Sequence, residues 1–565
     1  MINLHGKPFY LNQEQIDWVE NKIKTMSLLE KVGQLFCMNI RDFSDYMLDS
    51  MFDITEFGAV MFRECPLADA LAFTEKLQKR SKIPALIAAN LEKGGCGIVL
   101  EGTQVGSQLE VAATGDLELA RKLATVCSRE GAAAGANWAF APILDIDFNF
   151  RNPITNVRTF GSNPDTVCLM SKAYVQEVQK NGMAACIKHF PGDGCDERDQ
   201  HLCTTVNDLS CEEWNRTFGK VYGECIEAGA LTCMVGHIMQ PAYSRYFNPK
   251  LADEEILPGS LSKELMTDLL RGKLGFNGMI CTDASTMNGY AIPMPRAKAL
   301  PTSINAGADM ILFSRNMVED FNIVLSAVES EEISYQRLDE AVTRVLATKA
   351  ALQLHNGAVL PSLEESQKTI GCFEHKAWAK ECAHKAITLV KREPQVLPLS
   401  SEKTRRVLLC PIENYDPSSY FNLTESVKEE FISRLEREGF EVTVFTPDPS
   451  MEGFTATSTY YTENFDLCLY VVNLATKSNQ TAVRIEWQQP MGADCPKMIT
   501  EIPTVAVSMN NPYHLLDMPR VRTYINCYAS NTDTLDALFE KLMGRSEFLG
   551  KNPVDPFCGK WDARL

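Results

Sequence analysis

The chain has 565 residues, 45% hydrophobic and 23% charged, which is long enough for two globular domains and too apolar for extensive disorder. Its formal net charge is −18 at pH 7, and an acidic surface repels phosphate backbones, so we expect no nucleic-acid partner. No stretch approaches the roughly 18 consecutive apolar residues that a membrane span needs, so we expect no membrane partner either.

Between residues 30 and 315, eight short apolar runs alternate with helical patterns. Their apolarity is continuous, which indicates strands buried on both faces. The runs are Gly33–Ile40, Phe57–Phe62, Pro84–Ala89, Asn137–Pro142, Ala184–His189, Leu231–His237, Gly278–Asp283 and Ala308–Phe313. Eight strand-then-helix units predict a (β/α)8 TIM-type barrel. A doubly wound open sheet is the alternative, which the absence of G-x-G-x-x-G after the first run disfavours.

Residues 164–181 and 260–272 have apolar side chains at helical spacing, and residues 329–354 have the pattern of closing helices. A polar linker follows, and further apolar runs then begin. They are Val407–Ile412, Val442–Phe445, Leu467–Val472, Thr504–Ser508 and Thr523–Tyr528, with helical patterns at 426–439 and 532–542.

We therefore predict three parts in the chain. Residues 1–355 form the barrel, residues 356–380 form the linker, and residues 381–565 form a smaller three-layer α/β domain of flavodoxin-like type.

The 19 cysteines are scattered singly, a spacing that predicts neither a disulfide framework nor a zinc site. Cys186, Cys233 and Cys281 lie within apolar runs and are interpreted as buried, reduced thiols. The N-terminus has no apolar segment typical of a signal peptide. We expect a cytoplasmic protein that uses no metal and no cofactor.

Polar residues end or follow five of the eight predicted barrel strands, on the side where chemistry gathers in such barrels. They are Asn90 with Glu92, then Asp145 and Asp147 with Arg158 in the same loop, then Lys188 with His189, then His237, and finally Asp283. Their convergence predicts a site. Structural roles stay open for each: Asp283 could cap a helix, His189 and His237 could bond to backbone, and Asp145 could bind sugar hydroxyls or only hold its loop.

The loop after the fifth run contains Asp199-Gln200-His201. A carboxylate beside an imidazole favours the protonated ring, which is the form that a general acid needs. A solvated loop histidine is the alternative interpretation.

Several motifs occur together and in a recognisable order. They are R-T-F-G at 158–161, K-H-F-P-G-D-G-C-D-E-R-D-Q-H at 188–201, G-H-I at 236–238, L-G-F-N-G-M-I-C-T-D at 274–283 and A-G-A-D-M-I-L at 306–312. The chain resembles glycoside hydrolase family 3, in its β-N-acetylglucosaminidase branch, over the whole predicted barrel.

The resemblance implies a retaining exo-β-N-acetylhexosaminidase with a carbohydrate substrate. Asp283 would be the nucleophile, and His201, oriented by Asp199, the acid/base. The substrate-binding residues would be Lys188, His189, Arg158, His237, Asn90, Glu92 and Asp145.

Two positions depart from the family pattern. Asn90 stands where the family usually has an aspartate, which leaves gluco against galacto specificity open, and Asp193 stands where the branch often has a histidine. Phosphorolysis, another exo-β-glycosidase specificity, a substrate-assisted mechanism at Asp145-Ile146-Asp147 and sugar binding without catalysis are the alternatives. The aglycone and the oligomeric state stay open.

Overall fold

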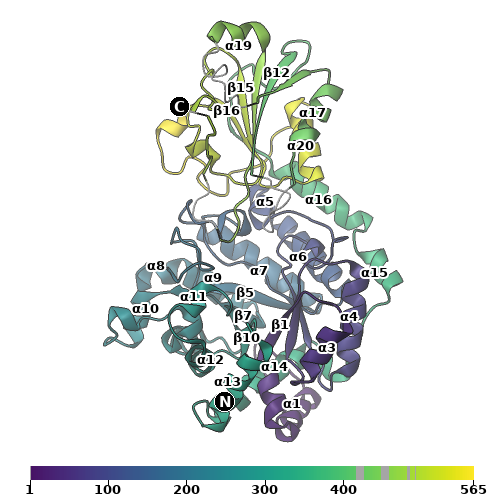
Figure 1. Ribbon diagram of the computed structural model, residues 1–565, viewed down its shortest axis with the longest axis vertical. Helices are drawn as coiled ribbons and strands as arrows, with labels where there is room; N and C mark the ends of the chain where they lie inside the picture. The colour runs from purple at the N-terminus through teal and green to yellow at the C-terminus, as the bar shows by residue number, and fades with distance from the viewer. Residues whose placement is uncertain (1, 415–424, 447–456, 480–483, 490–491) are drawn as a thin grey trace. The chain divides into compact units, whose positions relative to one another are not determined.

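The computed structural model describes residues 2–414, 425–446, 457–479, 484–489 and 492–565, which form two compact units (Figure 1). The first unit comprises Met1–Val105, Ala120–Asn149 and Pro164–Lys376. The second comprises Gly106–Leu119, Phe150–Asn163 and Ala377–Leu565. Two segments from the first third of the chain therefore belong to the second unit.

The first unit is a closed barrel of parallel strands in the order β1-β10-β9-β7-β5-β4-β3-β2. The strands are β1 Phe36–Ile40, β2 Ala59–Phe62, β3 Leu86–Ala89, β4 Trp138–Ala139, β5 Ala184–Phe190, β7 Thr232–Val235, β9 Met279–Ala284 and β10 Met310–Leu312. Every residue of β2, β3 and β7 is buried, because one face lines the barrel and helices cover the other. The predicted barrel is confirmed. Each strand lies inside its predicted run or extends beyond it by one residue.

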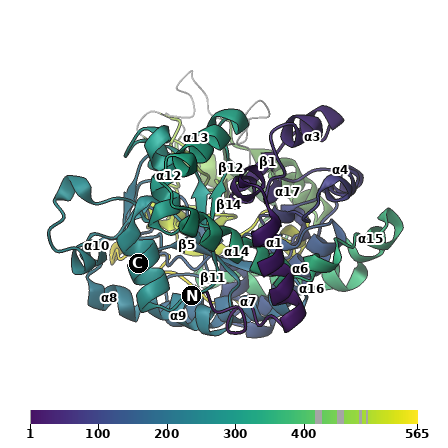
Figure 2. The same cartoon turned by 90° about the horizontal axis from the view of Figure 1, so that it is seen from below.

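Helices ring the strands on the outside, as the view from below makes plain (Figure 2). Those of the first unit are α1 Gln13–Thr25, α2 Leu28–Gly33, α3 Asp45–Phe52, α4 Leu67–Arg80, α7 Pro164–Lys180, α8 Cys211–Arg216, α9 Phe218–Glu227, α10 Pro241–Phe247, α11 Asn288–Ala291, α12 Arg296–Ala306, α13 Met317–Glu329, α14 Tyr335–Ala351 and α15 Leu363–Thr369. Helix α6, Leu117–Ala133, begins in the second unit and continues into the first, while the segment Glu264–Lys273 is a π-helix.

A six-stranded sheet organises the second unit, in the order β11-β16-β15-β14-β12-β13. The strands are β11 Thr388–Lys391, β12 Arg406–Glu413, β13 Glu441–Val444, β14 Leu467–Asn473, β15 Thr504–Ser508 and β16 Thr523–Asn526. The last five are parallel in the order 2-1-3-4-5, which is the flavodoxin-like arrangement predicted from the sequence. The prediction missed β11, an antiparallel edge strand paired with β16.

Alternate residues of β12 enter different cores, as expected for a sheet buried on both faces. Val407 and Leu409 pack in one cluster with Phe431, whereas Leu408 and Cys410 pack in another. The sheet is thus the middle of three layers. The helices of this unit are α5 Gln108–Ala113, α16 Phe373–Ala386, which begins in the first unit, α17 Lys428–Arg437, α19 Ser458–Asn464 and α20 Thr532–Leu542.

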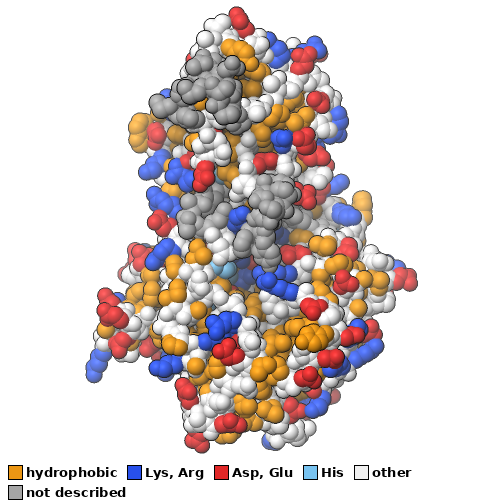
Figure 3. All heavy atoms as spheres, in the orientation of Figure 1, with side chains coloured by type: hydrophobic (Ala, Val, Ile, Leu, Met, Phe, Trp, Pro, Cys, Tyr) orange, Lys and Arg blue, Asp and Glu red, His pale blue; other side chains and the backbone are white. Residues whose placement is uncertain are grey.

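Acidic and basic side chains are interspersed over the visible face of the molecule (Figure 3). Among the residues that the structure describes, no helix is both long and apolar enough to cross a membrane.

Candidate active site

Asp283 directly follows the buried part of strand β9. Residues 279–282 are buried, whereas the Asp283 side chain keeps 15% of its surface exposed. Its Oδ1 accepts the backbone N–H of Ala284 at 2.7 Å. The capping interpretation does not hold, because the next helix, α11, has Met287 as its N-cap. The carboxylate therefore sits at the carboxyl rim of the barrel.

The surroundings of Asp283 favour its ionised form. The Nε2 of His189 lies 4.0 Å from its Oδ2. Burial alone would raise the pKa of Asp283, but neighbouring histidines, above all His189, and the Ala284 N–H bring it below its ordinary value. The group is therefore ionised at neutral pH, as a nucleophile or an electrostatic stabiliser must be.

Asp145 holds both the ring and the backbone of His189 through hydrogen bonds. Its Oδ2 accepts from the His189 ring Nδ1 at 2.7 Å, and its Oδ1 accepts the backbone N–H groups of His189 at 3.1 Å and Asp193 at 2.8 Å. Asp145 has no exposed surface. It is therefore placed to orient the imidazole, and its buried carboxylate has no open face toward a ligand.

Lys188, on β5, and Glu92, which follows β3, come together although β4 lies between these two strands. The Lys188 Nζ donates to Glu92 Oε1 at 2.7 Å, and both side chains are largely buried. Asn90 follows β3 and is partly exposed. Among the described residues, no hydrogen bond engages its amide side chain, so this group is available to a ligand.

His201 and Asp199 form the pair predicted from their spacing. The His201 ring Nδ1 lies 2.7 Å from Asp199 Oδ1, and the same oxygen accepts the His201 backbone N–H at 2.8 Å. Asp199 is buried, whereas the His201 side chain is 31% exposed. Because Nδ1 faces the carboxylate, Nε2 is the ring nitrogen left to exchange a proton with solvent or a ligand.

Sequence reasoning treated Gln200 only as a spacer, yet it anchors this loop. The side chain is fully buried; its Oε1 accepts the His237 backbone N–H at 2.8 Å and its Nε2 donates to Asp193 Oδ2 at 3.3 Å. The Gln200 carbonyl accepts from Gly289 at 3.2 Å. Asp193, which departs from the family pattern, thus has a structural role. Its carboxylate accepts a hydrogen bond from the Gln200 side-chain amide and so helps to anchor the loop.

His237 is completely buried behind the carboxylate. Its Nδ1 lies 2.8 Å from Ser260 Oγ and its Nε2 lies 3.0 Å from the Ala284 carbonyl. Since a carbonyl only accepts, Nε2 carries the proton. Burial lowers the pKa of His237 to about 4, so the ring is neutral at pH 7. Both ring nitrogens of His237 therefore have hydrogen-bond partners within the protein. His237 thus supports the end of strand β9.

Arg158 belongs to the second unit of the chain. It ends the 3₁₀ segment Asn156–Arg158. There Val157 packs with Tyr513 and Val554. All the other predicted site residues belong to the first unit.

This rim of a β/α barrel carries an ionised carboxylate and a histidine–aspartate pair. A group transfer assisted by a general acid/base needs these two kinds of group. The model of the glycosyl hydrolase family 3 N-terminal domain matches residues 27–348, more than half of the chain. The chain belongs to glycoside hydrolase family 3. The resemblance seen in the sequence motifs, and with it the enzyme class, is confirmed.

The proteins similar to this chain match it over nearly its whole length. A beta-N-acetylglucosaminidase/beta-glucosidase from Cellulomonas fimi is 48% identical over the full length of both proteins. Among solved structures, a beta-glucoside phosphorylase named BglX is 46% identical, with a TM-score of 0.93 and 99% of each chain covered. A family 3 beta-N-acetylglucosaminidase from Paenibacillus sp. str. FPU-7 is 26% identical, with a TM-score of 0.79 over 94% of this chain and 99% of that one.

Proposed function

We propose that the protein is a retaining exo-β-N-acetylhexosaminidase in which Asp283 forms a covalent glycosyl-enzyme and the His201–Asp199 pair supplies and removes the proton. The observation that carries the proposal is the tethered loop: the His201 carbonyl accepts the backbone N–H of Asn288 at 3.0 Å, which holds the His201–Asp199 pair beside the chain that follows Asp283 at the barrel rim. Cytoplasmic location stays a prediction from the sequence.

In the first step, an Asp283 carboxylate oxygen attacks the anomeric carbon while the bond to the aglycone oxygen breaks. His201 donates its Nε2 proton to that oxygen, so the aglycone leaves as an alcohol. In the second step, neutral His201 takes a proton from water as the water oxygen attacks the anomeric carbon and releases Asp283. Two inversions at one carbon retain the configuration.

Asp199 supports this cycle because its buried carboxylate keeps the His201 ring oriented and stabilises the imidazolium. Lys188, Glu92, Asn90 and His189 are proposed to bind the hydroxyls of the sugar. Asp145 and His237 support the same site from beneath, through His189 and Ala284. Arg158 stays a proposed sugar ligand on the strength of its family motif.

A panel of chromogenic glycosides tests the specificity. We expect the highest kcat/KM on the β-N-acetylglucosaminide, followed by the glucoside, with the N-acetylgalactosaminide and the xyloside lower. The name of the Cellulomonas fimi relative joins the first two activities, which supports the choice of these two substrates. A clear preference for the xyloside would contradict the expected order.

Phosphorolysis is the second candidate, because a relative that covers 99% of the chain is named a phosphorylase. After the first step a neutral imidazole repels an incoming phosphate less than a carboxylate would. Phosphate oxygen would then replace water in attacking the anomeric carbon. Turnover in added phosphate, analysed for sugar 1-phosphate against free sugar, separates the two reactions.

Trapping tests the nucleophile directly. A 2-fluoro glycoside with a good leaving group slows the second step, so the glycosyl-enzyme accumulates. Peptide mass spectrometry is expected to find the label on the peptide containing Asp283. A label on another carboxylate would remove Asp283 from the mechanism while leaving the family assignment unchanged.

A further inference from the structure

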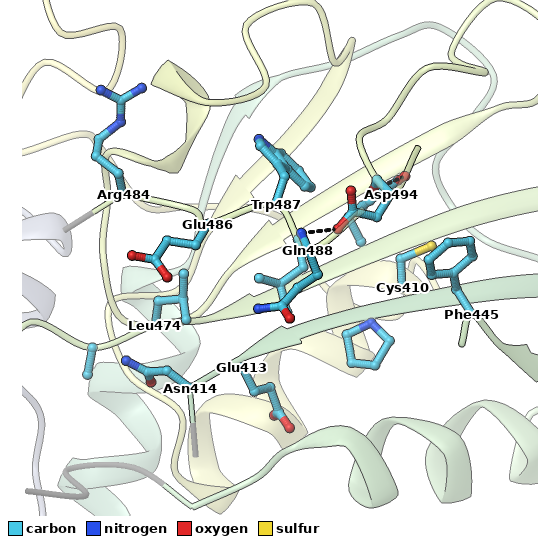
Figure 4. Close-up of a pocket in the computed structure, with 14 residues that line it drawn as sticks. Cys410, Glu413, Asn414, Phe445, Leu474, Arg484, Glu486, Trp487, Gln488 and Asp494 are labelled. Atoms are coloured by element: carbon cyan, nitrogen blue, oxygen red, sulfur yellow. Dashed lines mark hydrogen bonds between the residues drawn. The ribbon is translucent and has the colours of Figure 1, made fainter. Parts of the chain in front are cut away.

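The second unit contains a cavity of roughly 500 Å³ that the barrel chemistry does not use (Figure 4). It opens at the carboxyl end of β12, where Glu413 and Asn414 line it, and beside β14, where Leu474 follows the strand. In the order 2-1-3-4-5, β12 and β14 are the first and third strands. The strand order reverses between them, and open α/β sheets bind ligands at this switch point.

The opposite wall is the segment 484–488, which carries Glu486, Trp487 and Gln488. In Figure 4 the Glu486 and Gln488 side chains point from this segment toward the ends of β12 and β14. Tyr470 and Phe445 add aromatic surface. The cavity therefore combines apolar ring faces with polar groups that converge from two sides, which is the usual make-up of a small-molecule site.

The charged groups of the lining are mostly committed to the protein. Arg484 donates from Nε to Asp517 Oδ1 at 2.6 Å, and it is the sole cation among the described lining residues. The Glu413 carboxylate accepts hydrogen bonds from the Ser426 hydroxyl at 2.7 Å and from the Val427 backbone N–H at 2.8 Å. With acidic residues on both walls and its cation paired, the cavity disfavours a phosphate or another anion.

We propose that this cavity binds a neutral carbohydrate. The Glu486 carboxylate and the Asn414 and Gln488 amides are hydrogen-bonding groups suited to sugar hydroxyls. Trp487 lines the cavity and packs partly against the buried cluster that contains Tyr470, so it adds apolar surface for the C–H groups of a pyranose. The volume lies within the range of sites for small molecules, about 300–1,000 Å³. This site is additional to the proposed function of the barrel and does not depend on it.

The test uses the full chain and Trp487 as its own reporter. The fluorescence difference between the native protein and Trp487→Phe isolates the response of this residue during titration with N-acetylglucosamine or glucose. We expect a saturable change with the native protein. The double variant Glu486→Ala/Gln488→Ala keeps Trp487 and is expected to bind the same sugar at least tenfold more weakly. Trp561→Phe, a 75% exposed tryptophan outside the cavity, is the matched control and should behave as native.

A second measurement separates this site from the barrel. Each sugar is also assayed as an inhibitor of chromogenic glycoside hydrolysis, and its inhibition constant is expected to be the same in native protein and double variant. An equal rise of the inhibition constant and the fluorescence dissociation constant would mean a single binding event and would overturn the second site. A Trp487 response to inorganic phosphate but to neither sugar would overturn the ligand class. Should the protein lack glycosidase activity, the fluorescence result still decides.

Discussion

Gln200 accepts the backbone N–H of His237 through its Oε1 at 2.8 Å, which ties the loop carrying His201 to the chain leaving β7. The same side chain donates to Asp193, whose own N–H donates to Asp145 beneath His189. One connected hydrogen-bond network thus runs from the residue that contacts the Asp283 carboxylate to the loop of the proposed acid/base. Because Gln200 adjoins His201 in the chain, a shift of this amide moves the imidazole.

Gln200→Ala is therefore expected to lower kcat more than it raises KM, by roughly 10-fold to 100-fold on substrates with poor leaving groups. On substrates with good leaving groups the loss should be small, because proton donation then matters less. The measurement is the dependence of kcat/KM on leaving-group pKa. An equal loss across the whole series would show general damage to the site and not a misplaced acid.

Gln179→Ala is the matched control for this variant. Gln179 also bridges two backbone groups, donating to the Gly229 carbonyl at 2.7 Å and accepting the Leu231 N–H at 2.8 Å. It does so at the amino end of β7, away from the catalytic rim. The variant should cost a similar stability, about 1–2 kcal/mol, with unchanged leaving-group dependence.

His201→Ala should show the same pattern more strongly. Loss of a general acid costs about 10²–10⁴-fold on poor leaving groups, and far less on a dinitrophenyl glycoside. Asp199→Asn keeps the shape but removes the charge that stabilises the imidazolium, so we expect an intermediate loss. If Asp199→Asn matched the native enzyme across all leaving groups, the paired role of the two residues would be untenable.

Asp283→Asn should remove activity by roughly 10³-fold or more while leaving the fold intact, because the amide oxygen can still accept the Ala284 N–H. In the native enzyme the pKa of Asp283 lies below its ordinary value, so the carboxylate stays ionised down to acidic pH. If kcat/KM falls on the acidic side at a pH above 5, this fall should therefore reflect the protonation of a group other than Asp283. A fall there that shifts with conservative changes at Asp283 would contradict this assignment.

The sequence was sufficient for the barrel and for the placement of Asp283 because both follow from local patterns. Continuous apolarity marks strands covered on both faces, and the residue that ends such a run must emerge at the rim. The same logic located Lys188, His189 and His237. β11 was not predicted because Thr388–Lys391 is a short edge strand whose partner, β16, lies more than a hundred residues away in the sequence.

The contacts that organise the site were beyond reach of such patterns. The Gln200–His237 and Asp193–Asp145 hydrogen bonds join residues 37 and 48 positions apart. They depend on how the loop closes, and no periodicity encodes that. Likewise, nothing in the motif around Arg158 indicates that its segment packs with the second unit. Patterns and motifs in the sequence predicted the candidate residues for the chemistry, whereas the groups that hold them in place emerged only in three dimensions.

His237 gives a pH dependence of stability with a definite sign. Its pKa is about 4 in the folded protein and about 6.5 when exposed in the unfolded chain, so between these values the unfolded state binds more protons. The free energy of unfolding should therefore fall as the pH drops from 6.5 to 4, by up to about 3 kcal/mol from this residue. Native-state hydrogen exchange of the β7 and β9 amides measures it locally.

His237→Gln should be less stable at pH 7, because the buried Ser260 and Ala284 groups lose well-placed partners, yet its stability should vary less between pH 6.5 and 4. His514, whose pKa burial lowers to about 3, gives a dependence of the same sign in the second unit and serves as the internal comparison. His514→Gln should flatten the pH response of β15 and β16 and leave β7 and β9 unchanged. An unaltered slope at β7 and β9 in His237→Gln would show that another buried group takes up the proton.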